Sequence, residues 1–205
     1  MKTQKTAVVS LSPEEGRCLV RLARLTIADR LKRPVDEKER QSVEAELQHP
    51  VFTHPCSTFV TLKKKGHLRG CIGSLVSDTP LRENVRQNAI HAAFQDPRFP
   101  PLGQEEFDQI GIEVSVLSPP EALSFADGDD LLERLRPGID GVILRKGHAS
   151  ATFLPQVWKQ LPRRQDFLSH LCLKAGLAAQ AWREGDLAVE TYQVQYFEEE
   201  SFDRG

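Results

Sequence analysis

The chain has 205 residues, of which 40% are hydrophobic and 27% are charged, a composition unlike that of disordered, collagen-like or coiled-coil proteins. Its 27 basic and 29 acidic residues give a formal net charge of -2, so no global field draws the protein to DNA or an anionic membrane. The N-terminal residues are too polar for a signal peptide, and no stretch approaches the ~20 apolar residues of a membrane span. We therefore expect a cytoplasmic protein that makes no use of a membrane.

The first expected element is a helix that begins after Ser12. Ser12 is a hydroxyl N-cap, Pro13 takes the first helical position, and Glu15 can reach back to the cap. Apolar residues then recur at helical spacing until Arg33-Pro34, namely Leu19, Leu22, Ala23, Ile27 and Leu31. The next segment, 36–47, is dominated by charge and is expected to be a solvated helix or a loop.

A β-hairpin is expected next. Residues 59–62 and 67–72 flank the basic, glycine-containing turn Lys63-Lys64-Lys65-Gly66. A second helix should begin near Pro80 and end at Asp96-Pro97. The strict alternation of apolar and other residues over 110–116 then predicts a strand with one buried face.

The C-terminal half repeats this pairing of hairpin and helix. After a short helix around 131–135, a second hairpin is expected from 141–144 and 151–154, followed by a helix over 167–176 and a strand over 189–196. Strands that arrive as hairpins between helices favour an α+β fold, an antiparallel sheet with flanking helices. We expect a single domain over 10–197, divisible into two closely packed subdomains, with tails at 1–9 and 198–205.

The most unusual segment is Leu68-Arg69-Gly70-Cys71-Ile72-Gly73. On an extended strand Arg69 and Cys71 would share a face, and glycines inside a strand are tolerated where another backbone or a ligand approaches closely. The basic residues near Cys71 in the sequence favour the thiolate, which attacks electrophiles or binds soft metals. The alternative is a buried cysteine that acts as a small, inert hydrophobe.

Three other residues are candidates to assist that thiol. His91, on the second helix, could accept its proton if the fold brings the two together, and Glu113 on the following strand is a second possible proton carrier. The alternatives are a surface histidine and a glutamate that is solvated or paired with Arg69. Arg98 could bind substrate, or it could form a structural ion pair in a turn after the helix, where Asp96 caps backbone amides.

Metal and cofactor signatures are weak in this sequence. The pairs His54-x-Cys56 and His170-x-Cys172 each supply two soft ligands, whereas zinc needs three or four that converge. Phosphate-binding glycine loops and the serine-hydrolase elbow are absent, so we expect no metal and no cofactor. The basic tip at Lys63–Lys65 is the best candidate for contacting a nucleotide or RNA, and solvated turn lysines are the alternative.

Several of these segments, in this order, resemble the AMMECR-one domain family, the A component of the AmmeMemoRadiSam group. The resemblance covers about Ser10 to Phe197. The segments that carry it include Phe59-Val60-Thr61-Leu62, Leu68-Arg69-Gly70-Cys71-Ile72-Gly73, Asp96-Pro97-Arg98-Phe99, Ile112-Glu113-Val114-Ser115-Val116-Leu117, Asp140-Gly141, Phe153-Leu154-Pro155-Gln156-Val157-Trp158 and Lys174-Ala175-Gly176-Leu177.

The resemblance implies an α+β fold of two subdomains, with the segment around Cys71 as the functional site. It also implies association with a radical-SAM enzyme and a Memo-type protein in a modification pathway, with RNA bases or nucleotides as suggested targets. Three hypotheses follow. In the first, Cys71 acts as nucleophile with His91 and Glu113 as proton carriers, while Arg69, Gly70, Gly73 and Arg98 bind substrate. In the second, the same cleft belongs to a non-catalytic module that binds substrate or bridges partner enzymes. The third is metal or redox handling.

Overall fold

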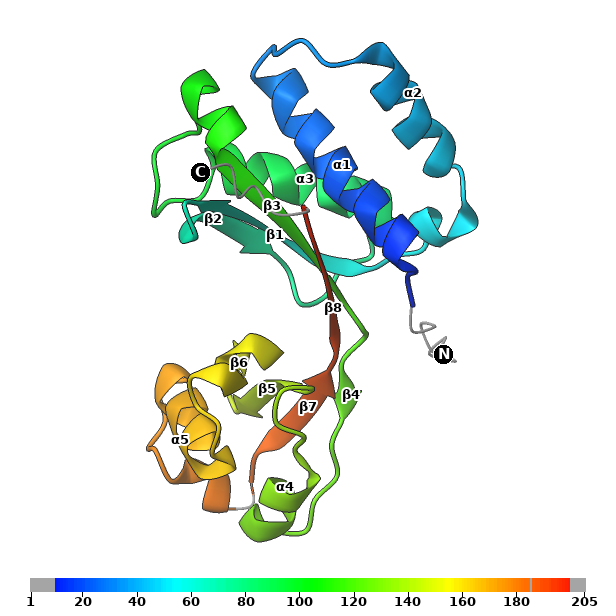
Figure 1. The fold of residues 1–205 in the computed structure, drawn as a ribbon. Coiled ribbons are helices and arrows are strands. Elements are labelled where there is room, and N and C mark those ends of the chain that lie inside the picture. The colour runs from blue at the N-terminus through cyan, green and yellow to red at the C-terminus, as the bar shows by residue number, and fades with distance from the viewer. Residues whose placement is uncertain (1–9, 185, 200–205) are drawn as a thin grey trace. The chain divides into compact units, whose positions relative to one another are not determined.

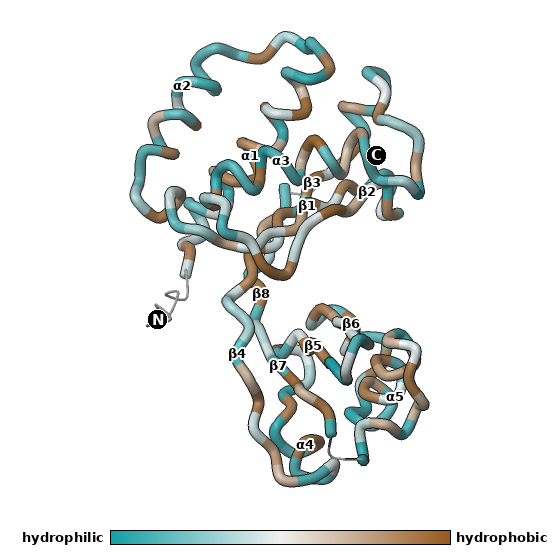
Figure 2. The backbone as a smooth tube through the Cα atoms, turned by 180° about the vertical axis from the view of Figure 1, so that it is seen from behind, coloured by the Kyte–Doolittle hydropathy of each residue, from teal (hydrophilic) through white to brown (hydrophobic). Residues whose placement is uncertain are grey.

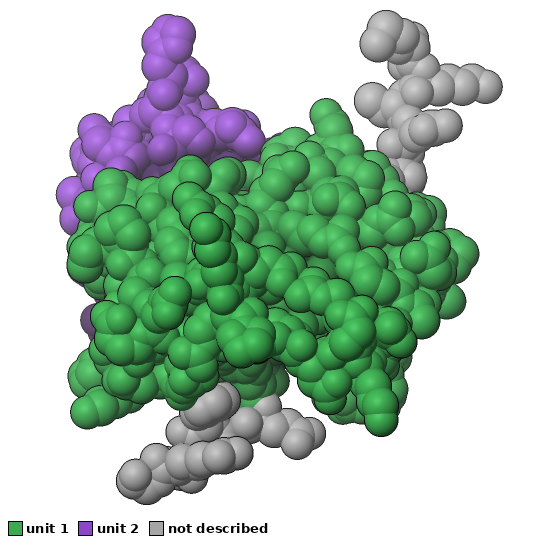
Figure 3. Space-filling model, turned by 90° about the horizontal axis from the view of Figure 1, so that it is seen from above, with its two compact units in different colours: residues 1–119, 195–205 green, residues 120–194 purple. Residues whose placement is uncertain are grey.

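The protein is described by a computed structural model that covers residues 10–184 and 186–199. The described residues form two compact units (Figure 3). Unit 1 comprises residues 10–119 and 195–199, and unit 2 comprises residues 120–184 and 186–194. The second unit is thus an insertion within the sequence of the first. None of the helices in the described ranges is long and apolar enough to cross a membrane.

Unit 1 is a four-stranded sheet with helices packed on one face (Figure 1). The strand order is β2-β1-β3-β8, and β1 pairs antiparallel with both β2 and β3. The strands are β1 (Ser57–Lys64), β2 (His67–Gly73), β3 (Ile110–Leu117) and β8 (Val194–Glu198). The helices are α1 (Pro13–Arg30), α2 (Glu37–Glu46) and α3 (Leu81–Phe94), with short 3-10 segments η1 (Pro50–Thr53) and η2 (Gln104–Gln109).

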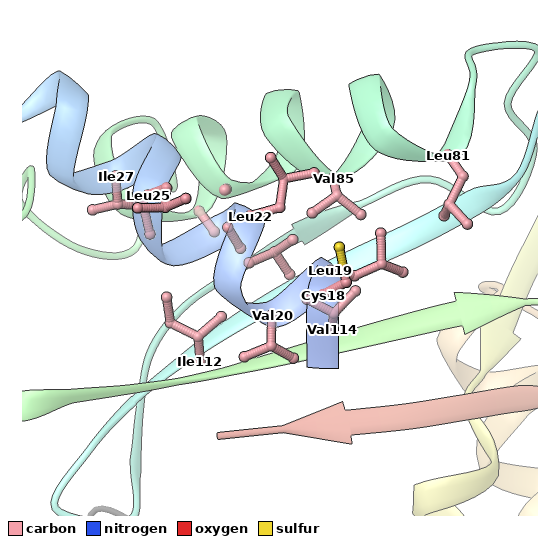
Figure 4. Close-up of a cluster of buried hydrophobic side chains, with 14 of the residues drawn as sticks. Cys18, Leu19, Val20, Leu22, Leu25, Ile27, Leu81, Val85, Ile112 and Val114 are labelled. Atoms are coloured by element: carbon pink, nitrogen blue, oxygen red, sulfur yellow. The ribbon is translucent and has the colours of Figure 1, made fainter. Parts of the chain in front are cut away.

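Helix α1 forms as its sequence predicts. The Ser12 hydroxyl accepts a hydrogen bond from the Glu15 backbone N–H at 3.2 Å, and the Glu15 carboxylate accepts one from the Ser12 N–H at 2.8 Å. The apolar side of the helix packs with α3 and β3 in one core, which Figure 4 shows around Leu19, Val85 and Val114. This layer of buried side chains fixes α1 and α3 over the same face of the sheet.

The charged segment after α1 is a helix rather than a loop. Asp36 caps α2 by accepting a hydrogen bond from the Lys38 backbone N–H at 3.0 Å. Arg21 on α1 donates to Glu39 at 2.6 Å, and the single buried side chain of α2 is Val43. α2 is held by its cap and by ion pairs with α1 more than by buried apolar side chains. The apolar pattern of its sequence is therefore weak and does not distinguish a helix from a loop.

Unit 2 has its own sheet, helices and core. Its strand order is β4-β7-β5-β6, and all three pairings are antiparallel. The aromatic rings of Trp158 and Phe167 stack at a centroid distance of 3.7 Å in the core. The same core contains Val142 and Leu144 from the hydrophobic part of β5 (Figure 2). The elements are β4 (Glu121–Ala122), α4 (Gly128–Arg134), β5 (Gly141–Lys146), β6 (Ala149–Phe153), η3 (Pro155–Lys159), α5 (Arg164–Lys174), η4 (Ala181–Arg183) and β7 (Ala188–Tyr192).

Two expectations about the C-terminal part need correction. The strand expected over 189–196 is two strands that meet near Gln193, β7 in the unit 2 sheet and β8 in the unit 1 sheet. Residue 198, which the expected C-terminal tail included, is the last residue of β8, and the carboxylate of Glu199 accepts hydrogen bonds from Arg24 on α1. Residues 1–9 and 200–205, the rest of the expected tails, lie outside the described residues.

Candidate functional site

The hairpin of β1 and β2 contains a β-bulge at Arg69. Leu62 pairs with Gly70 and Lys63 with Leu68, so Arg69 has no partner in the ladder. A bulge interrupts the alternation of side chains along a strand and re-aims the residue it carries. Without the bulge, Thr61 would face Gly70, but the shift of one residue places it opposite Cys71.

Three side chains therefore stand in a row across the sheet, which we call the Cys71 row: Cys71 on β2, Thr61 on β1 and Glu113 on β3. Gly70, the neighbour of Cys71, faces α3, so alternation directs the thiol to the opposite face of the sheet. The Thr61 hydroxyl donates a hydrogen bond to the Cys71 sulfur at 3.3 Å. Glu113 is one strand farther away, about 9–10 Å from Cys71 across two strand spacings, so no direct contact joins these two backbones.

Cys71 differs from the other cysteines in its exposure. Cys71 is half-buried, whereas Cys18, Cys56 and Cys172 are buried. Burial raises the pKa of Cys18 to about 12 and that of Cys56 to about 11, and it also raises the pKa of Cys172. Burial thus keeps these three thiols neutral and out of reach, and Cys71 is the thiol that an incoming molecule can reach.

The backbone of Cys71 is held by the loop after α3. The Asp96 carboxylate accepts a hydrogen bond from the Cys71 N–H at 2.9 Å, and the Arg98 guanidinium donates to the Cys71 carbonyl at 3.1 Å. Arg98 also donates to Asp96 at 2.6 Å. The hydrogen bonds from Arg98 and from the Cys71 N–H hold the pKa of the buried Asp96 carboxyl well below its usual range, so Asp96 stays ionised. We call Asp96 and Arg98 the clasp. It matches the structural ion pair that the sequence offered as one alternative.

Arg69 does not meet the thiol in the structure. It is 8% exposed and donates two hydrogen bonds to Glu106, at 3.2 and 2.9 Å, and one to the carbonyl of Pro100. Lys64 donates to the same carboxylate at 2.9 Å. The expected shared face of Arg69 and Cys71 is therefore not observed, because the bulge turns Arg69 toward η2 and the loop that precedes it.

The two glycines of the segment have packing roles. A Cβ atom at Gly70 would lie 2.2 Å from the carbonyl oxygen of Ala92, and one at Gly73 would lie 2.2 Å from the carbonyl oxygen of Thr58. Of the two reasons the sequence offered for these glycines, the structure shows the close approach of another backbone. Binding of substrate by Gly70 and Gly73 stays a prediction.

The proposed proton carriers are not assembled around the sulfur. His91 is half-buried on α3, which covers the face opposite the Cys71 side chain, and no hydrogen bond joins it to the thiol within the described ranges. Glu113 is buried and accepts a hydrogen bond from Lys63 at 2.8 Å rather than from Arg69. A role for either as a proton carrier stays a prediction that this geometry does not favour.

The basic hairpin tip is largely neutralised by acidic neighbours. Lys63 is paired with Glu113 and Lys64 with Glu106, which leaves Lys65 at the turn, where its backbone φ is 51°. Among the described residues no group of three or more His, Cys, Asp and Glu side chains could hold a metal ion. Nucleotide or RNA binding at Lys63–Lys65 stays a prediction.

Comparison with known proteins decides the family. The model of the AMMECR1 family, the AMMECR-one family of the resemblance, matches residues 20–197. The chain belongs to the AMMECR1 family. It is 39% identical to a protein of Methanothermobacter thermautotrophicus that it matches over 93% of its own length and 97% of the other, and 41% identical to one of Methanosarcina barkeri, with 92% of each chain covered.

The fold agrees with a solved structure. The crystal structure of uncharacterized protein PH0010 from Pyrococcus horikoshii matches this chain with a TM-score of 0.78 and 35% sequence identity, over 93% of this chain and 94% of that one. The expected α+β fold is thereby confirmed. This chain is thus an AMMECR1-family protein with uncharacterised relatives.

The segments of unit 2 that resemble the AMMECR1 family hold its core together. Asp140 is buried and accepts hydrogen bonds from the backbone and guanidinium of Arg136, while its carbonyl accepts one from the Trp158 indole at 2.7 Å. A Cβ atom at Gly141 would lie 2.4 Å from the ring of Tyr192, so the ring packs directly against this glycine. Burial raises the pKa of Tyr192 to about 12, so its hydroxyl stays protonated and contacts Thr152 at 3.0 Å.

Two residues of the site carry no signal of their role in the sequence. Counting residue pairs from the hairpin turn places Thr61 opposite Gly70, and only the bulge moves it opposite Cys71. Glu106, the partner of Arg69, is 37 residues away in the sequence and carries no local signal.

Proposed function

We propose that this AMMECR1-family protein is a non-catalytic, substrate-presenting component of a modification pathway. The radical-SAM enzyme and Memo-type protein implied by its family would act on what it presents. The Cys71 row is the contact surface in this proposal. The second of the three sequence hypotheses is thus preferred to the nucleophile.

One observation carries the preference for presentation over catalysis. The half-exposed Cys71 thiol has a neutral hydroxyl beside it, whereas the charged groups nearby are engaged with each other: Asp96 with Arg98, and Glu113 with Lys63. A cysteine nucleophile is commonly activated by a base within hydrogen-bond reach of the sulfur. The Thr61 hydroxyl is not such a base, and the carboxylates of Asp96 and Glu113 are paired with Arg98 and Lys63. A rigid thiol on a sheet face is well suited to contact and orient a ligand.

Replacing Cys71 in two ways separates presentation from catalysis. Mass spectrometry of a strain that lacks the gene would identify the metabolites and RNA nucleosides that disappear on deletion, which we call the products. Each variant is then expressed in this strain, and the return of the products is measured. Cys71→Ser keeps the size and polarity of the site and should restore them. Cys71→Phe covers the row and should lower them about tenfold or more, since a substrate that cannot dock is not presented.

The control variant is Cys172→Ala, which removes a buried thiol in unit 2 and should restore the products fully. Each variant is compared at equal abundance, with folding checked by circular dichroism. If Cys71→Ser abolishes the products as completely as Cys71→Phe does, the thiol is a catalyst. If both variants restore them, the row is not the contact surface.

A further inference from the structure

A cavity of about 340 Å³ lies in unit 1 beside α1, on elements distinct from the Cys71 row and the clasp. It is bounded by α1, by the start of α2 and the residues before it, by η2 and by the end of β8. The volume is near the lower end of the 300–1,000 Å³ typical of small-molecule pockets. None of its lining residues belongs to the Cys71 row or to the clasp.

The inner wall of the cavity is apolar. Val20, Leu25 and Ala28 line it from α1, and Val35 and the Phe107 ring face it from the neighbouring segments. On α1 these residues alternate with arginines at a spacing of three or four residues, so one stripe of the helix presents aliphatic surface between long basic side chains.

The charged side chains that line the cavity are already paired. Arg21 donates to Glu39 at 2.6 Å, and Arg24 donates to Glu199 at 2.8 Å while its guanidinium stands 4.8 Å from the Phe107 centroid. The remaining pairs have N–O distances of 2.8 Å for Arg17 with Glu14 and 3.8 Å for Lys63 with Glu198.

This pairing selects the kind of molecule that the cavity can hold. A charged ligand would have to compete with the part-buried ion pairs of Arg21 and Arg24 or bury its charge without a partner, and either costs free energy. An uncharged ligand leaves the pairs intact and gains by removing the apolar wall and its own surface from water. The chemistry therefore favours a neutral, largely apolar molecule.

We propose that this cavity binds a small, uncharged, apolar or aromatic molecule, in a site separate from the Cys71 row. The guanidinium groups of Arg24 and Arg33 lie 4.8 and 5.1 Å from the Phe107 centroid and fix this ring in the cavity wall.

Two matched fluorescent probes test this inference on the full chain. N-phenyl-1-naphthylamine is uncharged, and 8-anilinonaphthalene-1-sulfonate has the same ring system with one negative charge. Both brighten in apolar surroundings. The neutral probe should bind saturably at one site per chain and about tenfold more tightly than the sulfonate, because the sulfonate must disturb an ion pair.

Filling variants locate the site. Ala28→Phe puts a ring into the cavity from α1, and Val35→Trp does so from the partly buried segment before α2, which guards against one variant failing to fold. Each folded variant should weaken the neutral probe about tenfold or more. Val76→Phe, on a loop residue that is 67% exposed and does not line the cavity, should leave the affinity unchanged.

Three results would overturn the inference: no saturable binding of the neutral probe, equal binding by the filling variants and the wild type, or binding of the sulfonate at least as tight as that of the neutral probe. Cys71→Phe should leave probe binding unchanged. The cavity and the proposed function can therefore fail independently.

Discussion

At the scale of single residues, Glu106 shows how one carboxylate ties the bulged strand to its surroundings. It accepts hydrogen bonds from Arg69 and Lys64, and these, Arg69 first, lower its pKa from 4.5 to about 2. A carboxyl whose pKa is lower in the folded chain stabilises it above the unfolded pKa, and that stability is lost as the pH falls through the folded pKa.

We therefore expect the midpoint of urea unfolding to fall as the pH is lowered from about 5 to about 2, the window between the two pKa values. Glu106→Gln should make this pH dependence weaker. The dependence that remains should include a contribution from Asp96, whose pKa is also lowered. Glu105→Gln removes the same charge from an exposed neighbour and serves as the control. An unchanged pH dependence in Glu106→Gln would contradict this account.

At the scale of elements, two glycines in strands are expected to respond in opposite ways to the same change. Gly70→Ala would place a methyl group 2.2 Å from the Ala92 carbonyl and push β2 away from α3, which should lower the free energy of unfolding by about 1–3 kcal/mol. Gly111 on β3 has open space where its Cβ would be, so Gly111→Ala should raise the free energy of unfolding by about 0.5 kcal/mol. Chemical denaturation measures both, and equal effects would argue against the close packing at Gly70.

The elements that depend on local sequence were predictable. The capping box at Ser12, both hairpins and the helix that ends before Gly176 follow from neighbouring residues, and each was expected within a few positions. The division between β7 and β8 was not, because alternation continues across Gln193 and only the partner strands assign the two halves to different sheets. The two-residue strand β4 was too short to leave a pattern.

The site was predictable only in part, for the same reason. The alternation of side chains along a strand predicts that Cys71 and Gly70 face opposite sides of the sheet, as observed. The bulge that redirects Arg69 depends on how β2 pairs with β1, which the sequence of β2 does not show. The clasp joins residues 25 positions apart in the sequence, and no local pattern reports such a pairing.

At the scale of the whole molecule, the sequence of unit 2 interrupts that of unit 1 between two neighbouring strands, β3 and β8. The ends of the inserted segment lie side by side, since Glu121 pairs with Thr191 across β4 and β7. Each unit also has its own hydrophobic core. Insertions with adjacent ends can be removed at little cost in chain entropy.

Replacing residues 120–194 with a short Gly-Ser linker should therefore leave a folded unit 1. We expect cooperative thermal unfolding by circular dichroism and protected backbone amides in β1 and β3 by hydrogen exchange. The control is the full chain measured in the same way. A shortened chain without a cooperative transition would show that unit 1 depends on the insertion.

The clasp over Cys71 also has a consequence for how the protein behaves at high concentration. β2 is the outermost strand of its sheet, and unpaired N–H and C=O groups on such a strand invite a strand of another molecule to add to it. Asp96 and Arg98 occupy the backbone N–H and C=O of Cys71 with a buried carboxylate and a guanidinium, so this position in the middle of β2 is closed to a further strand. The two residues that hold the Cys71 backbone in place thus also block strand addition at this position of the edge strand.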